Sequence, residues 1–389
     1  MRNKEMLLIP GPTPVVDEIY DALAAETWGH TDPRFVEIYR RGLDMTRKLL
    51  NTDGEVFVVA GSGTLAMEMA IVNTVAPGEK LLVVSQGYFG DRFAPLAKAF
   101  GIHVETLQAE WGKRVDPQAV AAKLAEGGFK AVTVTHVDTS TGVMADVDAL
   151  MPIVKRAGAL FILDGVCATA GIEEDMGRDY GAPGQRIDVV LTGSQKAIGV
   201  PPGLAIVAFS PAALAAREAL ERVPAYYADI KNWLPVMRDP SKYFATPAIN
   251  MVYAYTKALE LIFAEGLPTR YARHAAYGKA IRAALAVYGM RALAAEGDAA
   301  PTLTCVLYPE GVNDADFRKR LAGKGMVVAG ALAALAGKAF RIGHMGNTTP
   351  EMLARAVALI GETLRELGAP VDVERALATF RETYAAGIR

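Results

Sequence analysis

A lysine and an aspartate each follow an apolar, strand-like run in the middle of the chain. Residues 160–163 lead into Asp164, and residues 187–191 are followed by Thr-Gly-Ser-Gln and then Lys196. Because ligands bind at the carboxyl ends of parallel strands, we expect both side chains to face one crevice. A lysine among small residues can form a Schiff base with an aldehyde cofactor, and an aspartate can keep a pyridine nitrogen protonated. The pair indicates pyridoxal phosphate, although each residue alone also suits a solvated lysine or a helix cap.

The segments around this pair resemble one enzyme family. They read DGV at 164–166, TGSQK at 192–196 and PPG at 201–203. This pattern is similar to the class V aminotransferases of fold type I, above all to the alanine:glyoxylate and serine:glyoxylate (serine:pyruvate) aminotransferases. The similarity extends from PGPT at 10–13 to FRIG at 340–343.

The resemblance implies an α/β fold of the fold type I transferases that bind pyridoxal phosphate. We expect a large domain with a mainly parallel seven-stranded sheet flanked by helices, and a smaller α+β domain at the carboxyl end. The predicted division is an N-terminal arm at residues 1–15, a large cofactor-binding domain at 16–247, and an interdomain helix with the small domain at 248–389.

Apolar periodicity predicts the elements that position the pair. Strands are expected at 55–60, 80–85, 131–136, 160–163, 187–191 and 204–209, and helices at 33–50, 146–157, 248–264 and 271–288. Residues 226–243 are predicted to form a long aromatic loop, and residues 350–389 to be mostly helical.

A glycine-containing turn, Gly61-Ser62-Gly63-Thr64, joins the first of these strands to a helix. The free N–H groups and the dipole of a helix start attract anions. We therefore expect Ser62, Gly63 and Thr64 to bind the cofactor phosphate. The same residues also suit a plain tight turn in which Thr64 is the N-cap.

The same turn supports a rival interpretation. Gly61, Gly63 and Ala66 satisfy the loose form of the dinucleotide fingerprint, which would indicate a nicotinamide-dependent dehydrogenase. That fingerprint requires an acidic residue at the end of the next strand. The strand at 80–85 is followed by Gln86, and Glu79 precedes it. The rival therefore lacks its ribose contact.

Further cofactor contacts follow from the resemblance. Phe89 corresponds to the ring that stacks on the pyridine, where many relatives carry tryptophan, although it also suits the core. Thr139 corresponds to the hydroxyl at the cofactor's phenolic oxygen, with Ser140 as an alternative. Val166 and Gln195 complete the cofactor-binding set in this chain.

Three residues are expected to act farther from the cofactor ring. By resemblance, Tyr243 and Thr246 reach the phosphate of a partner subunit, which implies a homodimer with shared sites. Arg341, on a strand, is expected to bind the substrate α-carboxylate through its planar fork. The alternatives are a solvent loop for the first two residues and a solvent-facing position for Arg341.

Composition limits the other possibilities. The chain has 389 residues, 51% of them hydrophobic and 22% charged, with a formal net charge of -2, which argues against a nucleic-acid surface. Cys167 and Cys305 are the two cysteines, too few for a disulfide framework, and they favour a reducing, cytoplasmic setting. We find no apolar run long enough for a membrane span and no metal-ligand cluster.

These observations predict a transaminase that moves an amino group from a small L-amino acid, alanine or serine, to glyoxylate or pyruvate. Lys196 would act as the general base and Asp164 would support the ring nitrogen. Ureidoglycine:glyoxylate, aspartate, pyridoxamine:pyruvate and 2-aminoethylphosphonate:pyruvate transaminases remain open. A cysteine desulfurase is disfavoured, because Cys167 directly follows the Asp164 turn and Cys305 lies within a predicted strand.

Overall fold

The central element of the computed structural model is a seven-stranded sheet; the structure describes residues 5–388. Its strand order is β2 (Glu55–Ala60), β10 (Leu204–Phe209), β9 (Val189–Gly193), β8 (Leu160–Asp164), β5 (Phe129–Thr135), β3 (Lys80–Ser85) and β4 (His103–Gln108). Strand β10 runs antiparallel to both β2 and β9, and the other neighbours are parallel. This confirms the mainly parallel seven-stranded sheet.

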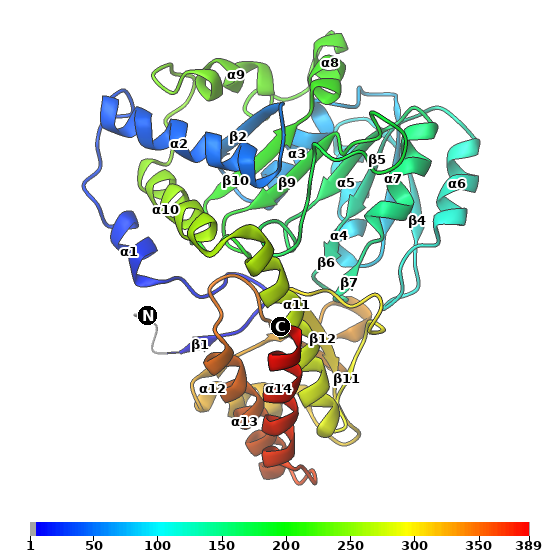
Figure 1. Cartoon of the computed structure of the whole chain (residues 1–389). Helices are drawn as coiled ribbons and strands as arrows, with labels where there is room; N and C mark the ends of the chain where they lie inside the picture. The colour runs from blue at the N-terminus through cyan, green and yellow to red at the C-terminus, as the bar shows by residue number, and fades with distance from the viewer. Residues whose placement is uncertain (1–4, 389) are drawn as a thin grey trace.

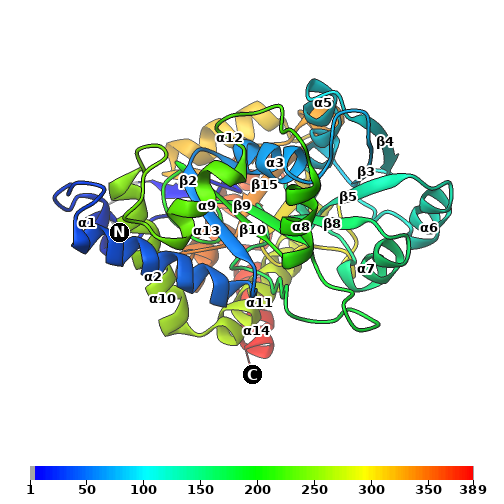
Figure 2. The same cartoon turned by 90° about the horizontal axis from the view of Figure 1, so that it is seen from above.

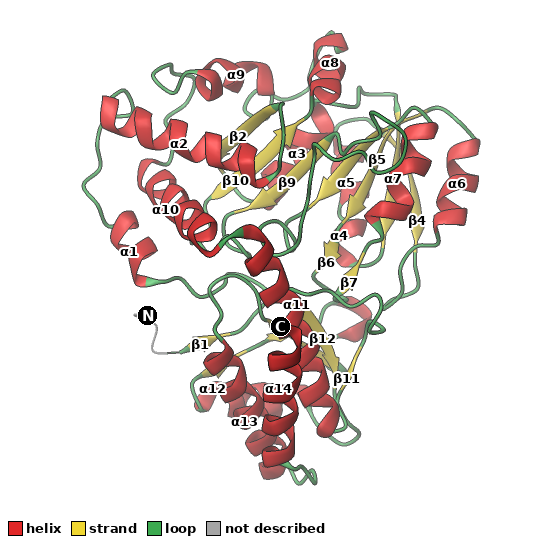
Figure 3. Ribbon diagram, viewed as in Figure 1, coloured by secondary structure: helices red, strands yellow, loops and turns green. Residues whose placement is uncertain are grey.

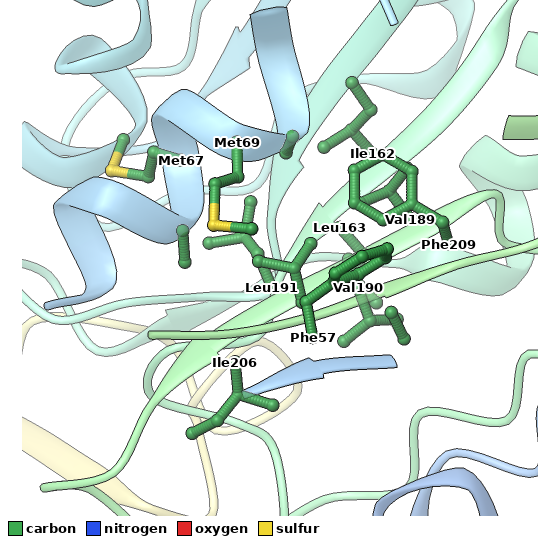
Figure 4. Packing of buried hydrophobic residues seen from close by; sticks show 14 of the residues in the cluster. Phe57, Met67, Met69, Ile162, Leu163, Val189, Val190, Leu191, Ile206 and Phe209 are labelled. Atoms are coloured by element: carbon green, nitrogen blue, oxygen red, sulfur yellow. The ribbon is translucent and has the colours of Figure 1, made fainter. Parts of the chain in front are cut away.

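Helices cover this sheet on both faces (Figures 1 and 2). The helices in this part of the chain are α2 (Pro33–Leu49), α3 (Gly63–Val72), α4 (Tyr88–Asp91), α5 (Phe93–Ala99), α6 (Pro117–Ala125), α7 (Val147–Arg156), α8 (Pro211–Ala219), α9 (Ile230–Arg238), α10 (Ile249–Glu265) and α1 (Asp17–Leu23), which packs against α10. Every residue of β9 and β10 is buried, which explains the apolar run of β10 and of residues 189–191 in β9. Figure 4 shows Met69 of α3 beside Leu191 of the sheet, within the cluster that also holds Leu163 and Val190.

A second, smaller sheet lies below the first in Figure 3. Its antiparallel order is β11 (Arg291–Ala292), β12 (Leu303–Leu307), β15 (Ala339–Gly343) and β14 (Ala329–Gly330). It is accompanied by α11 (Leu267–Val287), α12 (Asp314–Gly323), a short 3-10 helix (Ala333–Leu335), α13 (Pro350–Glu366) and α14 (Val373–Gly387). Tyr277, Phe317 and Phe340 belong to a separate hydrophobic cluster here. The domain limits at 15/16 and 247/248 stay predictions.

The N-terminal arm crosses between the two sheets. Strand β1 (Met6–Leu7) pairs in parallel with β13 (Met326–Val327), and the Gly343 N–H donates to the Leu8 carbonyl. The Thr13 N–H then donates to the Gln195 carbonyl beside the large sheet. The arm therefore contacts both layers; residues 1–4 of the predicted arm lie outside the described residues.

The prediction of a long aromatic loop at 226–243 is wrong, because helix α9 lies within it. The Asp229 carboxylate caps this helix by accepting the Lys231 N–H at 3.0 Å. Pro235 inside the helix removes one backbone bond, which made the segment look non-helical. Burial of Ile230, Trp233 and Met237, which share one helix face, compensates for that loss.

Two features are absent from residues 5–388. No helix there is long and apolar enough to cross a membrane. No group of three or more His, Cys, Asp or Glu side chains in that range could hold a metal ion.

Candidate active site

Turns that follow five strands of the large sheet enclose a cavity of about 130 Å³. The predicted residues that line it are Ser62, Gly63, Thr64, Phe89, Thr139, Asp164, Val166, Gln195 and Lys196. Met67, Arg92, Thr135 and Val137 also line it, and the sequence analysis did not identify them. The structure thus brings most of the predicted site together at the carboxyl edge of the sheet, as parallel strands dictate.

Asp164 is the last residue of β8 and is only 3% exposed. Its Oδ1 accepts the Val166 N–H at 3.0 Å, and its Oδ2 accepts the Thr135 hydroxyl at 3.4 Å. Burial raises the pKa of Asp164 to about 7, and the nearby carboxylates of Asp138 and Glu174 act in the same direction. A cation beside this carboxyl would favour its ionised form, which suits a protonated ring nitrogen.

Lys196 follows β9 and is buried beneath the N-terminal arm. Its Nζ donates to the Pro10 carbonyl at 2.5 Å. A Cβ added to Gly11 would lie 2.4 Å from Lys196 Cδ, and Gly11 has a φ of +109°, so this position requires glycine. The Lys196 side chain therefore lines the cavity and is contacted by Pro10 and Gly11 of the arm.

The turn before α3 has the properties of an anion site. Ser62 occupies the N-cap position and makes no side-chain capping bond, so the alternative of Thr64 as N-cap is wrong. The first N–H groups of a helix have no intrahelical acceptor. Gln195 Oε1 is buried without a hydrogen-bond partner, so the protein does not fix this carboxamide, which can turn its NH₂ toward a ligand. These donors fit a phosphate-bearing group.

Phe89 and Arg92 form one wall of the cavity. Both lie at the short helix α4, and the Arg92 guanidinium carbon is 4.9 Å from the Phe89 ring centroid. Arg92 Nη1 lies 3.5 Å from the Thr64 hydroxyl. Arg92 follows Phe89 by one helical turn, and this spacing is the signal by which sequence reasoning could have found it.

Thr139 and Ser140 were alternatives for one role, and their hydroxyls have different surroundings. Thr139 lines the cavity, and its Oγ1 is 2.7 Å from the Cys167 Sγ. Ser140 Oγ donates to Asp138 Oδ1 and accepts the Tyr88 N–H, so the protein already engages it. Burial raises the pKa of the Cys167 thiol, which disfavours a nucleophilic thiolate.

Arg341 lies on β15 and is 9% exposed, so the alternative of a solvent-facing arginine is wrong. Its Nε donates to the Gly330 carbonyl at 3.0 Å, and its Nη1 lies 3.5 Å from the Thr139 carbonyl. Arg341 does not line the cavity itself. It bridges the small sheet to the turn that carries Thr139, a residue that does line the cavity.

Tyr243 and Thr246 lie apart from this cavity. Tyr243 is 60% exposed; its hydroxyl is 3.3 Å from Thr246 Oγ1, and its ring centroid is 5.0 Å from that of His30. Tyr226 nearby is 78% exposed. Neither Tyr243 nor Thr246 acts on the cavity of its own chain in this arrangement.

Comparisons with known proteins agree with this geometry. The family model "Aminotransferase class-V" matches residues 16–344. The L-aspartate--glyoxylate aminotransferase of Paracoccus denitrificans is 31% identical over 99% of this chain and 97% of its own length. The serine--glyoxylate aminotransferase of Methylorubrum extorquens is 32% identical, covering 92% of this chain and 90% of its own. The crystal structure of pyridoxamine-pyruvate aminotransferase from Mesorhizobium loti superposes with a TM-score of 0.92 at 27% identity, covering 99% and 98%.

The chain belongs to the class V aminotransferases, and it is an enzyme of the aminotransferase type. The fold excludes the nicotinamide alternative. Strand β2, which precedes the Gly61 turn, is an edge strand whose neighbour β10 is antiparallel. The dinucleotide fingerprint instead belongs to the first strand of a parallel βαβ unit.

Proposed function

We propose that this aminotransferase binds pyridoxal 5'-phosphate in the cavity at the sheet edge and transfers the amino group of a small L-amino acid, alanine or serine, to glyoxylate or pyruvate. The observation that carries the proposal is that Lys196, Asp164 and the Ser62 turn line one cavity. An amine, a buried carboxyl and an anion-binding helix start match the three ends of that cofactor.

Each residue has a defined task in this proposal. Lys196 would hold the aldehyde, and Ser62, Gly63, Thr64 and Gln195 would hold the phosphate. Phe89 and Val166 would pack against the ring, Thr139 would donate to the phenolic oxygen, and Asp164 would keep the ring nitrogen protonated. The bound cofactor supplies an electron sink for the bonds at the substrate Cα.

The chain's own residues then bind the substrate and move its proton. Arg341 would hold the α-carboxylate of the amino acid or keto acid in a bidentate contact. Lys196 Nζ would take the proton from the substrate Cα as general base. The Pro10 carbonyl, 2.5 Å from Nζ, would hold the amine in place whenever Lys196 is not attached to the cofactor.

Support for a small donor comes from the relatives and not from the volume of the site, because the cavity of about 130 Å³ is the space that the cofactor itself would occupy. The name of the Methylorubrum relative, serine--glyoxylate aminotransferase, supports serine and glyoxylate.

Aspartate is a second candidate donor, because Arg92 places a cation in the cavity wall. The name of the Paracoccus relative, L-aspartate--glyoxylate aminotransferase, points the same way.

The functional unit in this proposal is a homodimer. The exposed Tyr243 and Thr246, whose hydroxyls lie 3.3 Å apart outside the cavity of their own chain, would donate to the phosphate bound in the partner subunit. Exposed aromatic surface at Tyr226 suits burial against a second copy.

The half-reaction tests the proposal. The purified protein is loaded with pyridoxal phosphate, its visible absorption is recorded, and L-serine, L-alanine and L-aspartate are added separately without any keto acid. We expect one donor to convert the band of the lysine-bound cofactor to that of the amine form, and Lys196→Ala to abolish the starting band. A protein that binds no pyridoxal phosphate, or a loaded protein that no amino acid converts, would refute it.

A further inference from the structure

Asp138 is a fully buried carboxylate that does not line the cavity. It ends the short strand β6 (Val137–Asp138), which pairs with β7 (Val143–Met144) just beyond the carboxyl end of β5. Among residues 5–388, no Lys or Arg side chain forms an ion pair with it. A buried carboxylate without an ion-pair partner is costly unless hydrogen bonds compensate, so that cost depends on which groups bond to Asp138.

On one side, Asp138 supports the start of helix α4. Its Oδ2 accepts the Phe89 N–H at 3.1 Å and the Gly90 N–H at 3.0 Å. The residue at the N-cap is Gly87, which has no side chain, and a Cβ there would lie 2.5 Å from Asp138 Oδ1. Asp138, which is distant in sequence, therefore caps the helix that carries Phe89.

On the other side, the same carboxylate fixes the turn that carries Thr139. Asp138 Oδ1 accepts the Ser140 N–H at 2.9 Å and the Ser140 hydroxyl at 2.6 Å. The Ser140 hydroxyl also accepts the Tyr88 N–H at 2.9 Å, which adds a second link to α4. Thr139 lies between the two anchored residues, and its carbonyl is 3.5 Å from Arg341 Nη1.

The two oxygens of one carboxylate thus join the segments that hold Phe89, Thr139 and the approach to Arg341. Bonds between backbone N–H groups and a carboxylate are charge-assisted and stronger than neutral ones. Burial raises the pKa of Asp138, and the bonds from Ser140, Gly90 and Phe89 act in the opposite direction.

We propose that Asp138 is a positioning residue, which sets the distance between the stacking ring of Phe89 and the hydroxyl of Thr139 through bonds to both segments. The inference rests on the proposed function, in which those two side chains contact the cofactor. It predicts that removing the charge of Asp138 loosens both cavity walls while the rest of the sheet keeps its structure.

Asp188 provides a control at the amino-terminal end of the interior strand β9, opposite to the end that faces the cavity. It is also a buried carboxylate, 3% exposed, and its Oδ2 accepts the Phe161 N–H at 2.7 Å and the Lys155 ammonium at 2.7 Å. It precedes β9, whereas the cavity lies beyond the end of that strand. Asp188→Asn therefore also removes a buried carboxylate charge, here one paired with Lys155, without touching the cavity.

The experiment compares wild type, Asp138→Asn and Asp188→Asn as full-length proteins. Hydrogen exchange of the cofactor-free proteins is followed by mass spectrometry in peptides covering residues 86–92. Pyridoxal phosphate affinity and the visible circular dichroism of the bound cofactor are then measured. For Asp138→Asn we expect exchange in that segment to be faster by about ten-fold, affinity to fall by about ten-fold and the dichroism to weaken. Asp188→Asn should change none of the three by more than about two-fold, although both variants lower the melting temperature.

Unchanged exchange and affinity in Asp138→Asn would overturn the inference, as would equal changes in Asp188→Asn, which would show a general loss of structure. If Asp138→Asn does not fold, Ser140→Ala removes the hydroxyl shared by both segments and should give the same changes at about three-fold. Failure of the wild type to bind pyridoxal phosphate refutes the proposed function instead, and the exchange measurement still decides whether Asp138 anchors α4.

Discussion

The buried turns at the edge of the large sheet and the exposed segment around Tyr243 differ in what a single chain can complete. Asp164 ends one strand, and Thr139 and Lys196 follow two others, yet the fold brings all three to one cavity. Tyr243 and Thr246 contact each other on the surface and line no part of that cavity. The fold of a single chain completes the first region. In our proposal, a partner subunit completes the second.

This difference assigns the two regions different energetics. A buried side chain in the cavity carries the cost of desolvation, which is seen in the raised pKa of Asp164. An exposed tyrosine hydroxyl carries almost none, so its removal changes binding and leaves the stability of the single chain nearly unchanged. Substitutions in the cavity should therefore change stability, whereas substitutions in the exposed segment should change binding alone.

The largest effect is expected at Lys196. Lys196→Ala should lower kcat by about 10⁴-fold or more, because both covalent attachment and proton transfer depend on Nζ. Turnover is measured by formation of the keto-acid product. Lys113→Ala, at an exposed lysine paired with Glu110, is the control and should keep wild-type turnover. Substantial turnover in Lys196→Ala would mean that another group carries the chemistry.

The next prediction concerns Asp164 in the cofactor-free protein. Its folded-state pKa of about 7 lies above the usual value of 3.8, so the folded state holds the proton more tightly than the unfolded state. This group's contribution to stability is therefore lost as the pH rises from about 4 to 7, at about 1.4 kcal/mol per unit of pKa shift. Asp164→Asn should remove that loss, as judged by urea unfolding at several pH values. Parallel pH profiles for the two proteins would contradict the burial argument.

Arg341 should affect substrate binding more than chemistry. Arg341→Lys keeps the charge and loses the planar fork, so we expect KM for the amino acid to rise by about ten-fold or more with a smaller change in kcat. Arg320→Lys, at an exposed arginine on α12, is the control and should leave KM unchanged. A fall in kcat at constant KM would assign Arg341 a different role.

The smallest effect is expected at the exposed segment. Tyr243→Phe should weaken pyridoxal phosphate binding by about two- to ten-fold, the value of one hydrogen bond, with no change in melting temperature. Tyr226→Phe is the matched control at a neighbouring exposed tyrosine.

Mixed subunits sharpen this test of the shared site. A dimer of one Tyr243→Phe and one Lys196→Ala subunit contains one cavity with both wild-type residues if the site is shared. That cavity should bind the cofactor with wild-type affinity. If every active cavity in the mixture keeps the weakened affinity, Tyr243 acts within its own chain or not at all.

Local sequence patterns predicted the parts of the structure that depend on neighbouring residues. Strand ends followed by Asp164 and Lys196, and the turn at Gly61, could be read directly because strand, turn and helix start are consecutive in sequence. The strand predicted at 187–191 instead begins at Val189, because the Asp188 N–H and carboxylate bond to Phe161.

Contacts between distant segments could not be read this way. Asp138 caps a helix that lies far from it in sequence, and its role became visible only in three dimensions. Arg92 was missed because an isolated arginine on a short helix usually faces solvent. Helix α9 was missed because Pro235 is unfavourable inside a helix, although the helix has an apolar face that contacts strand β2.

The central claim is that Lys196 is the residue that holds an aldehyde cofactor. The most direct measurement is to load the wild-type protein with pyridoxal phosphate, trap the lysine adduct with borohydride, and map the modified peptide by mass spectrometry. We predict a single pyridoxyl group on the peptide that contains Lys196. A pyridoxyl group on another lysine, or no modified peptide at all, would contradict the account.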